Sequence, residues 1–169
     1  MLPDPATFLT KLFSQLEPQP GALDHLPIDH ICYRVAGRAR YRELKNWLLA
    51  ENELLVESLV NGRPIATYRM NQPFRFGDRK IPLLELPMPK PGSPYPEGWE
   101  HAEFVTDRTL ADFEHWLISD LGIYPDDIDR SGLGKELNAD LRLRLEGGIS
   151  VKFHEQSLAD VIRIEGNLM

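Results

Sequence analysis

The sequence has 169 residues, of which 42% are hydrophobic and 27% are charged, and its formal net charge is −7. This length and composition are typical of a globular protein with one well-buried core. The acidic balance argues against nucleic acid or an anionic membrane as a partner, because either would require a clustered basic surface.

The first half predicts a helix followed by a β-α-β-β-β unit. Apolar side chains at helical spacing mark the first helix, and a connector rich in proline and glycine ends it. Alternating β-forming residues mark the strands, and Asn61-Gly62 is a strong hairpin signal. The expected elements are a helix over 5–17, a strand over 29–35, a helix over 39–52, two strands over 54–70 and a strand over 80–87.

After a bridge rich in proline, the same order starts again. Thr109 and Asp112 resemble a capping box at a helix start, and Gly147-Gly148 marks a turn. The expected elements are a strand over 100–105, a helix over 109–121, a strand hidden within 123–138, two strands over 139–154 and a helix over 157–165 with Ser157 as its cap. Their order repeats the β-α-β-β-β unit.

The whole chain is therefore expected to form a single α+β domain. Its expected parts are an N-terminal helix segment (1–26), a first βαβββ unit (27–88), the bridge (89–98), a second βαβββ unit (99–155) and a C-terminal helix segment (156–169). Only one cysteine is present, which excludes an internal disulfide framework and a zinc site built from cysteines.

Matching residues support an internal repeat. Asp29-His30 opens the first strand of one unit, Glu100-His101 opens that of the other, and each following helix carries a Trp-Leu pair. The closing strands also match, because each places a polar residue between two apolar ones: Glu85 in LLELP and Lys152 in SVKFH. Neighbouring residues of a strand face opposite sides, so Glu85 and Lys152 should face away from the core.

Tandem βαβββ units resemble the vicinal oxygen chelate superfamily, which includes glyoxalases and extradiol dioxygenases. The stretches DHICYRV, NGRPI, LLELPMP, YPEGWEHAEFV and VKFHEQS are similar to the YecM family within it, over roughly residues 26–162. The resemblance implies a curved mixed sheet that forms a cleft, with a divalent metal held by the first and last strands of each unit.

Carried onto this chain, the resemblance implies His30, Glu85 and His101 as metal ligands. The fourth position falls on Lys152, which departs from the pattern because a charged lysine cannot bind a cation. Two imidazoles and one carboxylate suit zinc, manganese, iron or nickel. Without a metal, Glu85 would need another partner, such as Arg34 or Arg69, because burying a lone carboxylate is costly.

Other polar residues share the expected cleft face. We expect Arg34 and Glu103 to pair across the two first strands, and Cys32 to be a packed thiol. His154 has four open roles: a replacement for the missing ligand, a base beside the metal, a substrate contact, or a purely structural residue. The candidate catalytic residues are His154 and Lys152, and the candidate substrate-binding residues are Arg34, Arg63 and Arg69.

The leading function is a metal-dependent enzyme that chelates an oxygen-rich anionic small molecule, with isomerase, lyase and dioxygenase chemistry all open. A protein of the same fold that binds or sequesters a small molecule is the alternative, and an interaction module is a third. No signal-like segment or long apolar run is present. A cytoplasmic location and a monomer or homodimer are expected.

Overall fold

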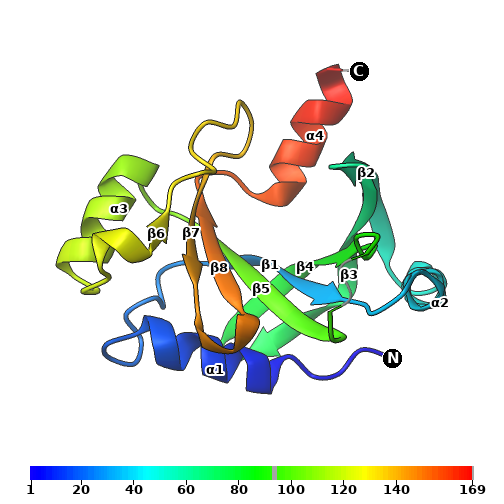
Figure 1. The fold of residues 1–169 in the computed structure, drawn as a ribbon, viewed down its shortest axis with the longest axis horizontal. Coiled ribbons are helices and arrows are strands. Elements are labelled where there is room, and N and C mark those ends of the chain that lie inside the picture. The colour runs from blue at the N-terminus through cyan, green and yellow to red at the C-terminus, as the bar shows by residue number, and fades with distance from the viewer. Residues whose placement is uncertain (93–94, 169) are drawn as a thin grey trace.

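The structure, a computed structural model, describes residues 1–92 and 95–168. The expected bridge (89–98) and C-terminal segment (156–169) each include residues outside these ranges. The helices are α1 (Ala6–Leu16), α2 (Arg38–Leu49), α3 (Leu110–Ser119) and α4 (Leu158–Leu168), and the strands are β1 (Ile28–Arg34), β2 (Glu53–Val60), β3 (Arg63–Phe76), β4 (Arg79–Pro87), β5 (Gly98–Val105), β6 (Ile128–Asp129), β7 (Asp140–Arg144) and β8 (Ser150–His154) (Figure 1).

All eight strands form one mixed sheet in the order β2-β3-β4-β1-β5-β8-β7-β6. In each half, the closing strand lies parallel to the opening strand: β4 beside β1, and β8 beside β5. The two opening strands, β1 and β5, pair antiparallel at the centre, so the halves are related by an approximate twofold axis. The expected α+β architecture of two tandem βαβββ units in a curved mixed sheet is confirmed.

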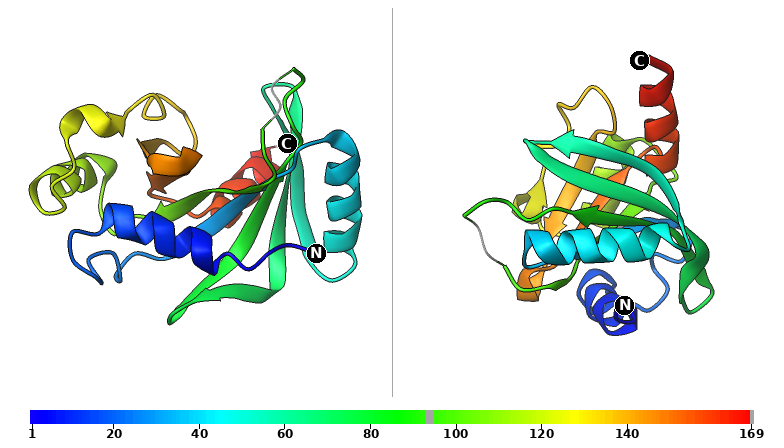
Figure 2. Two further views of the ribbon diagram at one scale, coloured as in Figure 1. Left: turned by 60° about the horizontal axis from the view of Figure 1, so that its bottom comes forward. Right: turned by 90° about the vertical axis from the view of Figure 1, so that its right-hand side faces the viewer.

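One face of the sheet carries the apolar core. Phe104 of β5 stacks on Phe153 of β8 at 5.5 Å between ring centroids, and Phe13 of α1 meets Phe104 edge-on at 5.9 Å. Phe113 of α3 packs on Phe153 at 4.8 Å. Helices α1 and α3 therefore cover this face, whereas α4 stands on the opposite side of the sheet from α1 (Figure 2). No helix in the described ranges has the length and apolar character needed to span a membrane.

The hairpin and caps follow the sequence closely. Asn61 and Gly62 join β2 to β3 with φ values of 51° and 74°, which is the conformation that an Asn-Gly turn favours. The hydroxyl groups of Thr109 and Ser157 accept backbone N–H groups of Asp112 and Asp160 at the starts of α3 and α4.

Strand β3 is longer than the sequence predicted. It runs to Phe76 instead of ending at residue 70, and its pairing with β4 is irregular between Arg69 and Phe74. The extension is stabilised by the core, because Phe76 stacks on Phe13 of α1 at 5.3 Å. The expected end was wrong because Pro73 interrupts the pattern of the strand without ending it.

Candidate metal centre

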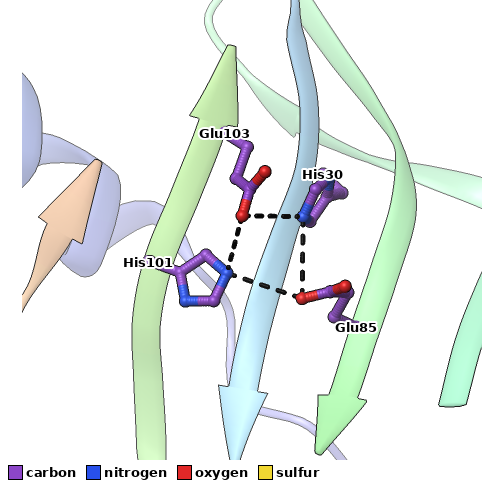
Figure 3. A group of neighbouring side chains, drawn as sticks. All are labelled: His30, Glu85, His101 and Glu103. Atoms are coloured by element: carbon purple, nitrogen blue, oxygen red, sulfur yellow. Dashed lines mark ion pairs between the residues drawn. The ribbon is translucent and has the colours of Figure 1, made fainter. Parts of the chain in front are cut away.

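Four side chains from the three central strands meet on the face opposite the core (Figure 3). His30 Nε2 of β1 lies 3.7 Å from Glu85 Oε2 of β4 and 3.5 Å from Glu103 Oε1 of β5. His101 Nε2 of β5 lies 3.5 Å and 3.3 Å from the same two oxygens. The structure thus brings together the three residues that the resemblance implied, and it adds Glu103.

The spacing and the unmet bonding capacity of this cluster fit a metal ion. Ligand atoms that are about 2.1 Å from one ion in tetrahedral geometry lie roughly 3.4 Å from each other. The measured separations of 3.3–3.7 Å match this value. The Nε2 atoms of His30 and His101 are buried and have no hydrogen-bond partner within the described residues. Two imidazoles and two carboxylates therefore supply four donors, and an ion that takes more than four ligands would keep positions for substrate oxygens.

A β-bulge orients each of the two histidines. Asp29 and Glu100 are each the extra residue where the pairing of β1 with β5 shifts by one position. Neighbours in a regular strand face opposite sides, and a bulge removes this constraint. His30 Nδ1 accordingly donates to Asp29 Oδ2 at 2.9 Å, and His101 Nδ1 donates to Glu100 Oε2 at 2.7 Å. Both rings are held with Nε2 turned toward the cluster.

The two orienting carboxylates are themselves held in place. Asp29 Oδ2 also accepts the backbone N–H of Leu158 at the start of α4, at 2.9 Å. Glu100 Oε1 accepts from Arg34 at 2.6 Å. A carboxylate behind a metal-binding imidazole fixes the ring tautomer and raises its basicity.

Glu100→Gln is therefore expected to weaken binding of a divalent metal by about 10- to 100-fold, the usual effect of removing such a partner. The amide can still touch His101, but it removes the charge that makes the imidazole a better donor. Calorimetric titration with Mn²⁺ measures the effect. Glu51→Gln, at an exposed carboxylate far from the cluster, is the matched control. Equal affinities of the two variants would contradict the orienting role.

The histidines and carboxylates of the cluster each stabilise the charged form of the other. Burial alone would lower the pKa of His30, but Glu103 and Glu85 raise it well above its ordinary value. Burial alone would raise the pKa of Glu85, but the facing histidines bring it well below its usual range. Burial would likewise raise the pKa of Glu100, yet His101 and Arg34 lower it to about 2. The carboxylates are therefore ionised at neutral pH.

The cluster forms the floor of a cleft of about 700 Å³. Side chains of β1 to β5, β7, β8, α4 and the loop between β6 and β7 line it. On β3, the lining residues are Arg63, Ile65 and Thr67, which decides the face of this strand that the sequence left open. Ala66 and Tyr68 are buried on the core side.

Lys152 and His154 both contact Glu103. Lys152 Nζ donates to Glu103 Oε1 at 2.5 Å, and this carboxylate raises the lysine pKa to about 12 although burial alone would lower it. His154 Nε2 lies 3.3 Å from Glu103 Oε2, and its Nδ1 donates to the carbonyl of Gln156. Lys152 lines the cleft, whereas His154 is fully buried behind the cluster. Glu103 is thus held between two basic side chains.

The three arginines expected to bind substrate lie in different places. Arg63 lines the cleft, and the described residues offer it no carboxylate partner. Arg34 pairs with Glu100, so the expected pair with Glu103 is wrong, as is the alternative pairing of Glu85 with Arg34 or Arg69. Arg69 is outside the cleft lining and lies 3.6 Å from Glu53 on the exposed neighbouring strand.

Sequence reasoning placed Glu103 on the cleft face but missed it as a possible metal ligand. It lies two positions after His101 on the same face of β5, and this spacing was the available signal. Cys32 occupies the equivalent position of β1, two after His30, and lines the cleft floor. Burial raises the pKa of the Cys32 thiol, so it stays neutral, as expected for a packed cysteine.

Comparisons with known proteins find one matching family model and two proteins of similar sequence. The family model described as YecM protein matches residues 1–165. Protein YecM of Escherichia coli (strain K12) is 28% identical over 148 residues, 83% of this chain and 79% of that protein. An uncharacterized protein of Haemophilus influenzae is 39% identical over 87 residues, 49% of this chain and 44% of that protein. The chain therefore spans less than half the length of this second relative.

A solved structure described as Structural Genomics, Protein EC4020 has the same fold. It superposes with a TM-score of 0.73 at 27% sequence identity, covering 95% of this chain and 86% of that chain. The family resemblance inferred from the sequence motifs is confirmed by the match over residues 1–165.

Proposed function

The chain belongs to the YecM family, and on this premise and the geometry of its cleft we propose that it is a metal-dependent enzyme acting on an oxygen-rich anionic small molecule. One observation carries the proposal. The buried Nε2 atoms of His30 and His101 have no hydrogen-bond partner in the described part of the chain, and they face two ionised carboxylates at metal-ligand spacing. The expected cytoplasmic location belongs to the same proposal.

A divalent ion bound there would act as a Lewis acid toward substrate oxygens. His30 and His101 would bind it through Nε2, and Glu85 and Glu103 through one oxygen each. Zinc, manganese, iron and nickel all suit this donor set. Lys152 holds Glu103 ionised and in position from the cleft side.

Positive side chains around the cleft support an anionic substrate. Among the described residues Arg63 donates to the neutral backbone carbonyl of Met88 at 3.4 Å, so its charge is available to a ligand. Lys152 lies beside Glu103, and a metal that shares this carboxylate would leave the lysine charge partly unbalanced. His154 Nδ1 donates to the carbonyl of Gln156, and its Nε2 faces Glu103 Oε2 at 3.3 Å, which places this ring beside a proposed metal ligand.

The test uses untagged protein purified without chelators. Elemental analysis should find a divalent metal near one equivalent per chain, or titration with Mn²⁺ should saturate at that ratio. Oxalate should then raise the melting temperature of the metal-loaded protein and leave that of the metal-free protein unchanged, because a ligand that binds only the folded form stabilises it by mass action. No metal uptake, or an equal oxalate shift in both forms, would refute the proposal. Binding of substrate without turnover would favour a sequestering protein instead.

Metal binding should also release protons. The raised pKa values of His30 and His101 determine the direction in which metal affinity changes with pH. Below these values each imidazole carries a proton on Nε2 that the metal must displace, so affinity should rise with increasing pH. Each displaced proton contributes about tenfold per pH unit. Calorimetry in two buffers of different ionisation enthalpy counts the protons. An affinity independent of pH between 5 and 8 would contradict this assignment of the free Nε2 atoms.

A further inference from the structure

The cleft above the metal cluster has one wall that is rich in aliphatic side chains, with polar residues such as Ser58 and Arg63 among them. Six aliphatic side chains from β2, β3 and α4 line it: Val56, Leu59, Val60, Ile65, Val161 and Ile162. Leu59 is 75% exposed and Val60 is 43% exposed. Leu59 contributes little to the core, since most of its surface meets solvent, and Val60 is also among the exposed side chains. Figure 1 shows α4 on the side of the sheet opposite to α1, and β2 is the edge strand of that sheet.

The wall contributed by the second unit is mostly polar, apart from Leu137. Lys135, Asn138 and Arg142 line it, and they belong to β7 and to the loop that precedes it. Asn138 Oδ1 and Arg142 Nε are both buried, and neither has a hydrogen-bond partner in the described ranges. Buried polar atoms are nearly always paired, so these two have bonding capacity left for a ligand.

The two walls differ in chemistry but border the same metal cluster. A small, wholly polar acid would leave the aliphatic wall in water, whereas a wholly apolar ligand would leave the polar atoms unpaired. A volume of about 700 Å³ is also much larger than oxalate requires. The arrangement suits a ligand with an oxygen-rich head and an aliphatic body.

We propose that the substrate is an amphipathic 2-hydroxy or 2-oxo acid, whose oxygen-bearing end lies at the metal cluster and whose aliphatic tail lies against β2 and α4. This inference rests on the proposed function, since the acid binds the metal-loaded protein. Beyond the proposed function, the inference gives the substrate an aliphatic tail and assigns the recognition of this tail to Leu59 and Ile162.

The test is calorimetry of the Mn²⁺-loaded protein with straight-chain 2-hydroxy acids: glycolate, 2-hydroxybutyrate, 2-hydroxyhexanoate and 2-hydroxyoctanoate. Affinity should rise by about fourfold per added methylene, the factor expected for burying one such group. Leu59→Ser and Ile162→Ser should each reduce this slope and leave the affinity for glycolate unchanged. Leu49→Ser removes an aliphatic side chain that is 43% exposed outside the cleft, and it should keep the parent slope.

The outcomes separate the two proposals. Equal affinity across the series would overturn the amphipathic substrate while glycolate binding still supports the metal-dependent function. A steep series with the same slope in both cleft variants would overturn the placement of the tail. No binding of any acid to the metal-loaded protein would overturn both proposals. If the parent is a dimer by light scattering and Leu59→Ser dissociates it, the aliphatic wall is an interface between copies, and the tail site is refuted.

Discussion

Replacing His101 with alanine is expected to weaken the binding of Mn²⁺ or Zn²⁺ by more than about 100-fold. Losing a residue that merely orients a ligand typically costs about 10- to 100-fold, and His101 is proposed as a ligand itself. Its Nε2 lies within 3.5 Å of both cluster carboxylates. Alanine leaves Glu85 and Glu103 facing each other with one imidazole fewer, so they repel each other more strongly.

His115→Ala is the matched control for this measurement. His115 is also a histidine of the second unit, but it is exposed on α3 and outside the cleft lining. Its variant should bind metal like the parent by calorimetry. Circular dichroism should confirm that the His101→Ala protein is folded. A folded His101→Ala variant with parental affinity would show that the cluster does not hold the metal.

Replacing Phe104 with alanine is expected to lower the free energy of unfolding by about 3–5 kcal/mol, the range for large-to-small changes in a core. Phe104 is fully buried on β5 and contacts both Phe13 and Phe153. This ring therefore joins α1, the first segment of the chain, to the closing strand of the second unit. Because β1 and β5 pair within one continuous sheet, both parent and variant should unfold in a single transition.

Urea denaturation followed by tryptophan fluorescence measures this change. Tyr124→Ala, at a ring that is 75% exposed, should change stability by less than about 0.5 kcal/mol. Two separate transitions in the parent would contradict a core shared by the two units. If Phe104→Ala lowered the free energy of unfolding as little as the control does, Phe104 would not be central to the shared core.

The sequence alone determined the repeated architecture and most of the cluster. Alternation placed Glu85 away from the apolar face, and the family resemblance implied His30, Glu85 and His101 as ligands on the first and last strands of the units. The structure has them on β1, β4 and β5, which are adjacent in the sheet. Strand faces follow from a period of two residues, so they can be inferred wherever apolar and polar residues alternate. The sequence predicted the shorter features less accurately. β6 has only two residues, and the end of β3 depends on contacts with α1.

Only the tertiary structure decided how the polar side chains pair. Glu103 was expected to reach Arg34, but Lys152 from the neighbouring strand pairs with it instead, and Arg34 reaches Glu100. Register explains the first pair, since Glu103 and Lys152 are direct partners across β5 and β8. The bulges at Asp29 and Glu100 explain the second, since an extra residue changes which side chains face the cluster. A bulge is set by the pairing of two strands far apart in sequence, and no local pattern encodes it.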